Sequence, residues 1–421
     1  MRPPFRGGRF GDNGPVALVA GNARQDVVVF HHRDKARKWR PKAKTRQPEY
    51  RRPVSATHSQ GVASGPLRIA LLAPPLVPVP PPRYGGTERV VGTLAEGLHR
   101  LGHDVTLFAA GDSTVSCRLV PVVPRALWPA GFRGEVGPFM QLTVAAVAGH
   151  EQDFDLIHSH VETYGFMFAR QAAVPVLTTL HLRLDLPPAA DLIRIYRDVP
   201  LVAISDNQRR LVPEGNWVAR IHHGMEFADP ADAMPRAGEA PYLAFVGRVA
   251  LDKGIDAAID TARRTGLRLH VAAKSFQPDE VRLFSELVQP AIDEGVVEFH
   301  GELTPAERDT MLAGACATLM LGSWPEPFGL AAIESLGLGT PVVGRRAGAL
   351  PEIVRHGLDG YIVDDVDGAV RALDAVTGLD RVAIRESARQ RFSARRMVED
   401  YVQLYRRLIA QRGSATPAGV P

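Results

Sequence analysis

Short apolar runs alternate with helical stretches along the chain from residue 67 onward. In the first half the runs are residues 67–72, 105–109, 156–158, 176–179 and 201–204. Such short runs, without strict alternation of polar positions, predict strands that are buried on both faces, as in a parallel sheet. Residues 85–98 form the first of the intervening helical stretches. The alternation therefore predicts β-α-β units.

The alternation pauses at residues 228–240, a Pro-containing stretch of small and polar residues, and then starts again. Further strands are predicted at residues 242–246, 267–272, 296–300, 317–320, 341–343 and 360–363, with helices at 255–264 and, after the last strand, at 395–411. A chain of 421 residues exceeds what one core usually serves. We predict an α/β protein of two Rossmann-like, doubly wound parallel-sheet domains facing a cleft, at residues 66–233 and 234–392.

The first 65 residues lack this pattern and are strongly basic. They hold 14 Lys and Arg against 4 Asp and Glu, whereas the other residues hold 36 against 42, so the pI of 9.2 mainly describes this segment. We expect a disordered tail over residues 1–65. An electrostatic tether to anionic lipid or to nucleic acid is one interpretation. A solvated extension, or upstream sequence included by a wrong start site, is the interpretation that we favour.

Composition also restricts the cellular setting. The two cysteines, Cys117 and Cys316, are far apart in the sequence and are expected to be free thiols in a reducing compartment. No apolar run reaches the roughly 18–20 residues that span a bilayer, and no apolar segment follows the N-terminal arginines as in a secretory signal. A cytoplasmic location is expected, with the basic tail offering at most a weak contact with the inner face of the membrane.

The segment from Glu326 to Glu334 carries two carboxylates across a predicted loop-to-helix junction. Pro325 and Pro327 flank Glu326 and favour an extended loop, and a helix is predicted from about Phe328. The free N–H groups of that helix start could bind an anion, and the carboxylates could hold the hydroxyl groups of the same ligand. A proline-bounded helix start with acidic residues favoured by the helix dipole explains the same pattern.

Two cations follow the first predicted strand of the second half. Arg248 ends the strand, and Lys253 lies in the short loop before the next helix. Both are therefore placed at the carboxyl edge of a parallel sheet, where open α/β sheets bind ligands, and together they suit a diphosphate. The alternative is surface cations that cap the helix or pair with Asp252. In the first half, Gly85 and Gly86 open a helix that could approach a phosphate, although a tight turn also explains them.

Several histidines follow predicted strands of the first half. They are His158, His160, His181 and the adjacent pair at 222–223. A single histidine is more often structural than catalytic, and these spacings form no metal motif. The loop before Glu352 is rich in small residues and could admit a ligand, with ordinary loop packing as the alternative.

Taken together, these motifs resemble those of the retaining glycosyltransferases of family 4, which have the GT-B fold. The resemblance covers about residues 66–412. Its points are YGGTE at 84–88, LIH at 156–158, TLH at 179–181, VGR at 246–248, KG at 253–254, EPFGL at 326–330 with Glu334, and GTPVV at 339–343. One departure is Ala347-Gly348-Ala349, where members of the family often have two glycines.

The resemblance implies roles for the residues of the second half. Arg248 and Lys253 would hold the donor diphosphate, and Glu334 would bind the nucleotide ribose. Glu326 would hold the donor sugar together with three backbone N–H groups, those of Phe328, Gly329 and Leu330.

In the first half, His181 would lie beside the reacting sugar, and Gly86 would bring its backbone to the phosphates. Glu352 would lie near the nucleotide. The GT-B fold also implies that the last helix, within residues 393–412, crosses back to pack on the first domain.

The implied reaction moves a hexose-type sugar from a nucleotide-diphosphate sugar to an acceptor with retention of configuration. The leaving diphosphate would help to deprotonate the acceptor, and no protein nucleophile is implied. No metal or other cofactor is expected, because two cations can neutralise the leaving group. The acceptor could be a sugar, a lipid-linked sugar or a small molecule, and no specific nucleic-acid partner is expected. The donor nucleotide and its sugar stay open.

Two other classes of function fit parts of the chain. One is a non-catalytic nucleotide-sugar binding protein, and the other is a membrane or nucleic-acid adaptor that works through the tail. A starch- or glycogen-synthase-like polymerase is disfavoured, because the first helix start has Gly-Gly-Thr-Glu and no Lys-x-Gly-Gly-Leu loop.

Overall fold

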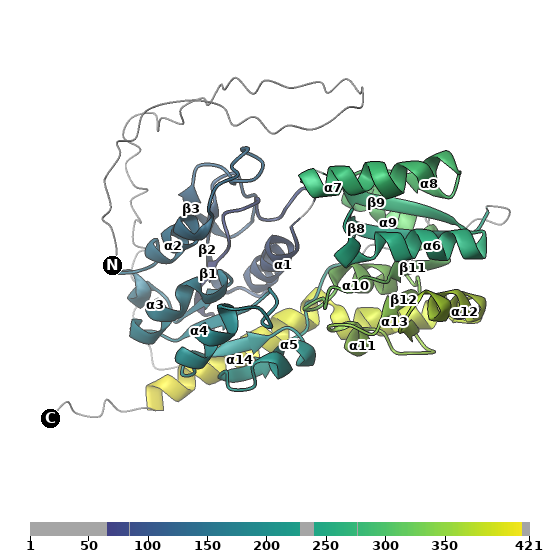
Figure 1. Ribbon diagram of the computed structural model, residues 1–421. Helices are drawn as coiled ribbons and strands as arrows, with labels where there is room; N and C mark the ends of the chain where they lie inside the picture. The colour runs from purple at the N-terminus through teal and green to yellow at the C-terminus, as the bar shows by residue number, and fades with distance from the viewer. Residues whose placement is uncertain (1–64, 84, 228–239, 276, 415–421) are drawn as a thin grey trace, which may run out of the picture. The chain divides into compact units, whose positions relative to one another are not determined.

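The computed structural model describes residues 65–83, 85–227, 240–275 and 277–414, which form two parallel sheets with their helices (Figure 1). The first sheet has seven strands in the order β3-β2-β1-β4-β5-β6-β7. Their bounds are β1 Arg68–Leu72, β2 Asp104–Ala110, β3 Arg118–Val123, β4 Leu156–Ser159, β5 Val176–Thr179, β6 Leu201–Ala203 and β7 Trp217–Arg220. The order reverses between β1 and β4, where a doubly wound sheet opens a crevice at the carboxyl ends of its strands.

The second sheet has six strands in the order β10-β9-β8-β11-β12-β13. Their bounds are β8 Tyr242–Arg248, β9 Arg268–Lys274, β10 Val297–Phe299, β11 Ala317–Met320, β12 Val342–Arg345 and β13 Gly360–Val363. Every pairing in both sheets is parallel. This sheet also reverses its order beside the first strand, between β8 and β11, so it offers a second crevice.

Helices connect the strands and cover both faces of each sheet. Those of the first half are α1 Gly86–Arg100, α2 Gly137–Ala145, α3 Phe166–Gln171, α4 Ala189–Ile195 and α5 Asp206–Leu211. Those that follow are α6 Ile255–Thr265, α7 Pro278–Leu283, α8 Gln289–Asp293, α9 Pro305–Gly314, α10 Leu330–Gly337, α11 Leu350–Ile353, α12 Val366–Val376, α13 Arg381–Phe392 and α14 Ala394–Ser414. Short helical turns occur at Glu151–Asp153, Glu162–Gly165, Leu251–Lys253 and Phe284–Val288.

The strand sequence explains why both faces are covered. In β1, Ile69 and Leu71 belong to one apolar cluster, and Ala70 and Leu72 belong to another. Successive side chains of a strand point to opposite faces, so an uninterrupted apolar run needs helices on each side. Burial of these side chains, at roughly 25 cal/mol per Å² of apolar surface, is the main stabilising term.

The last helix, α14, packs against the helices and strands of the first sheet. Its residues Met397, Val398 and Tyr401 lie in the same buried cluster as Val91 and Leu94 of α1. Figure 1 shows α14 in yellow, extending from the second half of the chain along the first. The connection between the two halves is therefore made twice, once before β8 and once by α14.

The structure differs from the sequence-based expectations in several details. Strands β3 and β7 were not predicted, and the helix expected from about Phe328 begins at Leu330. Residues 1–64 and 228–239 lie outside the described residues, and with them the predicted tail and the predicted boundary at 233/234. Cys117 and Cys316 are both free thiols. Among the described helices, none is long and apolar enough to cross a membrane.

Candidate active site

A cavity of about 450 Å³ lies where the carboxyl ends of the two sheets approach each other. It is lined from the first half by residues after β1 and β5, and from the second half by the ends of β8, β9 and β11 and the loop after β10. Nine of the ten predicted site residues line it: Gly86, His181, Arg248, Lys253, Glu326, Phe328, Gly329, Leu330 and Glu334. Packing thus brings together groups that are up to 248 positions apart in the sequence.

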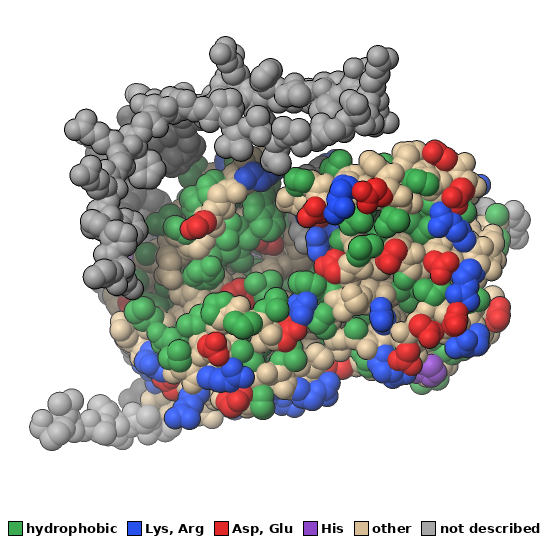
Figure 2. Space-filling model, viewed as in Figure 1, with side chains coloured by type: hydrophobic (Ala, Val, Ile, Leu, Met, Phe, Trp, Pro, Cys, Tyr) green, Lys and Arg blue, Asp and Glu red, His purple; other side chains and the backbone are tan. Residues whose placement is uncertain are grey.

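The cavity is suited to an anion. Seven Lys and Arg and four Asp and Glu are among its lining residues. The outer face drawn in Figure 2 differs, because Lys and Arg are interspersed there with Asp and Glu over the second half. The cavity lining therefore has an excess of basic over acidic side chains, which favours a small anionic ligand over a polyanion spread across the surface.

Lys253 and Glu326 form an ion pair in the cavity wall. Lys253 ends the turn after β8, and Glu326 lies in the loop between β11 and α10. The Lys253 ammonium also lies 5.4 Å from the ring centre of Trp324. Both charged side chains are about one-fifth exposed, so the pair is open to a ligand on one side.

Arg248, at the end of β8, is held between two carboxylates. Its guanidinium lies 3.2 Å from Asp252 and 3.2 Å from Glu280 of α7. Arg248 therefore does pair with Asp252, which was the predicted alternative to a ligand-binding role. Its side chain nevertheless lines the cavity. Because a guanidinium has five donors, it can keep these partners and still bind two oxygens of a ligand.

The α10 N-terminus provides backbone donors in the cavity. Gly329 precedes the helix with φ at 102°, a left-handed conformation that glycine adopts readily, so the helix begins only at Leu330. No described side chain caps the first turn, whose N–H groups have no partner within the helix except that of Ala332, which donates to the Gly329 carbonyl at 3.0 Å. The loop at Gly348 packs on the Glu326 backbone so closely that an added Cβ would lie 2.3 Å from the Glu326 oxygen. Glycine at 348 therefore keeps Glu326 in place.

Glu334, one turn inside α10, is bound by two arginines. Arg89 of α1 reaches it from the first half, and Arg308 of α9 lies 3.1 Å from the same carboxylate oxygen. The Glu334 side chain is only 7% exposed. Both arginines contact the same carboxylate oxygen, so the other oxygen of Glu334 can accept a hydrogen bond from a hydroxyl group of a ligand.

Four histidines form a row behind and beside the cavity. The histidine row consists of His158, His160, His181 and His223, with successive ring centres 4.0, 5.2 and 5.1 Å apart. His160 Nδ1 lies 2.9 Å from His181 Nε2. Burial lowers the pKa of His181 to about 3 and the pKa values of the other three well below the usual range. The row is therefore neutral at physiological pH.

The backbone of His181 is fixed by a second acidic residue. The carboxylate of Glu162 accepts hydrogen bonds from the His181 N–H at 3.1 and 3.2 Å. Glu162 itself has φ at 51°, an uncommon conformation for a residue other than glycine. Burial raises the pKa of Glu162 to about 8.

Family models match both halves of the chain. The model described as "Glycosyltransferase Family 4" matches residues 84–221, and the model described as "Glycosyl transferases group 1" matches residues 231–393. The chain belongs to the family 4 glycosyltransferases. The named relatives agree with this: the D-inositol 3-phosphate glycosyltransferase of Acidothermus cellulolyticus is 28% identical over 438 residues, covering 87% of this chain and 96% of its own.

Solved structures are similar to this glycosyltransferase over both halves. A glycosyltransferase involved in avilamycin A biosynthesis is 28% identical and covers 82% of this chain and 99% of its own, with a TM-score of 0.59. A sucrose-phosphate synthase from Thermosynechococcus elongatus has a TM-score of 0.67 at 21% identity and covers 82% of this chain and 100% of its own. The fold of the glycosyltransferase is therefore the expected GT-B fold.

One predicted site residue of the glycosyltransferase lies outside the cavity lining. Glu352, in α11, accepts hydrogen bonds from the backbone N–H groups of Asp206 at 2.7 Å and Asn207 at 2.5 Å, and lies 3.6 Å from His222. It thus caps α5 of the first half from the second. Donor binding by Glu352 stays a prediction, and these contacts give the carboxylate a different, structural role.

Other residues of the site carried no readable signal in the sequence. Arg89 and Arg308 are arginines within helices, and Glu162 is an acid in a short helical turn. Nothing in their local pattern separates them from surface charges. His160 was noticed as a histidine after a strand, but its contact with His181 depends on how β4 and β5 pair.

Proposed function

We propose that this glycosyltransferase transfers a hexose from a nucleotide-diphosphate sugar to a small acceptor, with retention of configuration and without a catalytic metal. The observation that carries the proposal is the convergence of Arg248, the Lys253–Glu326 pair and the α10 N-terminus on one cavity. A sugar bearing a diphosphate needs cations, backbone donors and carboxylates together, and a purely apolar pocket would not bind it.

The donor is proposed to lie along the second sheet. Arg248 and Lys253 bind its diphosphate, Glu334 accepts from the ribose hydroxyls, and Glu326 accepts from the sugar hydroxyls. An Anabaena protein with a TM-score of 0.63 to this chain was solved with UDP and glucose, and its 17% identity supports the fold alone. The choice between UDP and GDP is left to experiment.

In the reaction, the bond between the sugar C1 and the diphosphate oxygen breaks while a bond from C1 to the acceptor oxygen forms. Negative charge grows on the leaving diphosphate, so Arg248 and Lys253 stabilise the transition state more than the ground state. A diphosphate oxygen takes the acceptor proton on the same face of the sugar. Neutral His181 lies beside the reacting sugar and can donate or accept a hydrogen bond without adding charge.

The acceptor is proposed to enter from the first half of the chain, where Arg83 and Arg183 line the cavity. The relatives at 27–28% identity are named D-inositol 3-phosphate glycosyltransferases, so that compound is the first acceptor to test. The two arginines fit a phosphorylated polyol.

A thermal-shift screen with UDP-, GDP- and ADP-sugars tests the donor. A ligand present at 100 times its Kd should raise the free energy of unfolding by about 2.7 kcal/mol. Release of nucleoside diphosphate with D-inositol 3-phosphate and other acceptors then tests transfer, and NMR of the product shows its anomeric configuration. EDTA should leave the turnover number unchanged.

Each part of the proposal can fail separately. Stabilisation by a donor without turnover on any acceptor would favour the non-catalytic binding protein. An inverted product would refute retention, and loss of turnover in EDTA that Mg²⁺ or Mn²⁺ restores would refute metal independence. No stabilisation by any nucleotide sugar would refute the donor site itself.

A further inference from the structure

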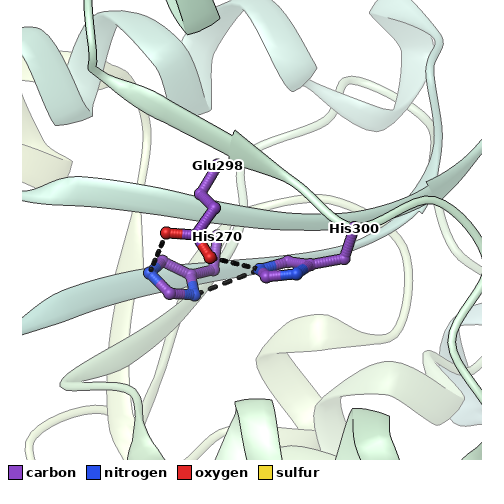
Figure 3. A group of neighbouring side chains, drawn as sticks. All are labelled: His270, Glu298 and His300. Carbon is purple, nitrogen blue, oxygen red and sulfur yellow. Dashed lines mark hydrogen bonds and ion pairs between the residues drawn. The ribbon is translucent and has the colours of Figure 1, made fainter.

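Two histidines and a glutamate meet at the edge of the second sheet, outside the cavity lining. His270 lies on β9, Glu298 on the edge strand β10, and His300 just after β10 (Figure 3). Glu298 pairs directly with His270 in the parallel register. His300 is two positions beyond Glu298, so its side chain lies on the same face of the sheet. Strand pairing alone therefore brings these three side chains together.

The spacing of the three side chains fits a shared cation. One ligand atom from each residue lies within 4.8 Å of the others. His300 Nε2 is 3.2 Å from His270 Nδ1 and 3.7 Å from a Glu298 oxygen, and His270 Nε2 is 3.6 Å from the other Glu298 oxygen. Ligand atoms about 2.0–2.2 Å from one Zn²⁺ ion are separated by similar distances. Figure 3 shows all three groups directed toward one another.

We propose that His270, Glu298 and His300 bind a divalent transition-metal ion of the Zn²⁺ type. Two imidazoles and a carboxylate suit Zn²⁺ and Co²⁺, whereas Mg²⁺ prefers oxygen ligands. The side chains of Glu298 and His300 are 45% and 26% exposed, so an ion can enter from solvent and water can complete its coordination. The site is separate from the proposed transfer chemistry, which needs no metal.

Neighbouring residues hold the first ligand in position. The ring of Tyr242 stacks on His270 with the centres 4.0 Å apart, and the Tyr242 hydroxyl donates to the Met311 carbonyl at 2.8 Å. Arg268 lies 3.5 Å from Glu298 and competes for its carboxylate. The stacking of Tyr242 orients the His270 ring and so supports metal binding. The contact of Arg268 with Glu298 lowers the affinity for a metal ion, because the ion must displace the guanidinium from the carboxylate.

The position of the ion connects it to the cavity. Gly301, Glu302 and Leu303 follow His300 directly and line the cavity, as do Ala272 and Ala273, which follow His270 on β9. Strand β10 is only three residues long and pairs with β9 alone. A bound ion would tie the carboxyl end of β10 to β9 and so steady the loop that forms this cavity wall. This consequence rests on the proposed function, whereas metal binding itself does not.

Calorimetric titration of the full chain with Zn²⁺, and the visible absorption of bound Co²⁺, test the site. We expect one ion at this site, with affinity reduced by about tenfold or more in His300→Asn and in Glu298→Gln. The matched control is the double variant His31→Asn, His32→Asn, which removes an adjacent histidine pair near the N-terminus of the sequence. That control should keep the Co²⁺ spectrum, and Mg²⁺ should not compete.

Wild-type affinity in both site variants, loss of the ion in the His31 and His32 control, or no Zn²⁺ binding at all would overturn the site. Because Glu298 is exposed and His300 is partly exposed at the sheet edge, both variants should fold, and a circular dichroism spectrum checks this. Donor titration with and without Zn²⁺ is a separate measurement. If Zn²⁺ changes the donor affinity of the wild type but not that of His300→Asn, the ion steadies the cavity wall. If Zn²⁺ leaves the donor affinity of the wild type unchanged, the effect on the wall is refuted and the metal site is not. Failure of any donor to bind would count against the proposed function and leave the metal site standing.

Discussion

Lys253 and Glu326, 73 positions apart in the sequence, bind each other in the cavity of this glycosyltransferase. Each had a separate predicted role, one on the diphosphate and the other on the sugar. The ion pair would join these roles in the proposed donor complex, because a ligand that draws Lys253 to its phosphate would free Glu326 for its hydroxyls. The pair thereby keeps both side chains near the position where a sugar diphosphate would need them.

Removal of either member of this pair should therefore reduce transfer. We expect Lys253→Ala to lower kcat/KM by about 10² to 10³-fold, the usual loss for a group that stabilises transition-state charge. Glu326→Ala should lower kcat/KM by roughly 10- to 100-fold, because it loses hydrogen bonds from the sugar hydroxyls to a charged group. The free energy of unfolding should change by less than about 1 kcal/mol in each variant, because the ion pair is partly exposed. Arg263→Ala, which breaks the exposed pair between Arg263 of α6 and Glu294 just after α8, is the control and should keep full activity. Wild-type rates in both Lys253→Ala and Glu326→Ala would contradict these roles.

Arg308 should matter for stability as well as for the site. It neutralises the buried carboxylate of Glu334, so Arg308→Met leaves that group with Arg89 alone among its ion-pair partners. The expected loss in the free energy of unfolding is about 1–3 kcal/mol. Arg264→Met breaks an exposed pair with Asp367 and should cost less than about 1 kcal/mol. Urea titrations measure the free energy of unfolding of both variants. Equal losses in Arg308→Met and Arg264→Met would show that the buried pair of Arg308 with Glu334 contributes no more to stability than an exposed pair.

Two neighbours in the histidine row should behave differently when substituted. His160 contacts His181, so we expect His160→Asn to lower kcat about tenfold while the donor KM and the pH dependence stay unchanged. His158 instead bonds the Tyr405 hydroxyl at 2.7 Å and the Thr179 hydroxyl at 2.8 Å. His158→Leu leaves both hydroxyls without this partner and should destabilise by about 2–4 kcal/mol. A His160→Asn enzyme with wild-type kcat would refute the positioning of His181.

The acid at the start of α1 should make stability depend on pH. Glu88 is 4% exposed, and burial raises its pKa from 4.5 to about 7. Below pH 4.5 the carboxyl is protonated in both the folded and the unfolded chain. As the pH rises toward 7, the unfolded chain loses the proton first, so stability declines and stays lower above pH 7.

Glu88→Gln removes this ionisation and should therefore stabilise the protein at pH 8 but not at pH 4. The difference at pH 8 should be at most about 3–4 kcal/mol, since the pKa rises from 4.5 to about 7 and one pKa unit corresponds to about 1.4 kcal/mol. Thermal unfolding of both proteins at the two pH values measures it. A variant that is less stable than the wild type at pH 8 would show that the charged carboxylate is favoured in the folded protein.

The strands and the position of the ligand site could be predicted from the sequence for a clear reason. A strand buried on both faces is mostly apolar, so the runs Ile69 to Leu72 of β1 and Leu243 to Val246 of β8 stand out from the helices around them. Polar residues that follow such strands must lie at the carboxyl edge of the sheet, which placed Arg248, Lys253 and His181. The edge strands β3 and β7 were missed: the run RLVPVV of β3 contains a proline, which argues against a strand, and the run WVAR of β7 is short and only partly buried.

The partners of these residues were decided only by the tertiary structure. Helix α10 begins two residues later than expected because Gly329 takes a left-handed conformation that depends on the loops packed around it. Contacts such as Arg89 with Glu334, or His160 with His181, join segments whose separation in sequence says nothing of their distance in space. The sequence by itself determined eleven of the thirteen described strands, their order of appearance and the sheet edge at which the candidate site lies. Which side chains meet at that edge was decided by packing, because a side chain's neighbours are set by strand order, helix position and domain approach together.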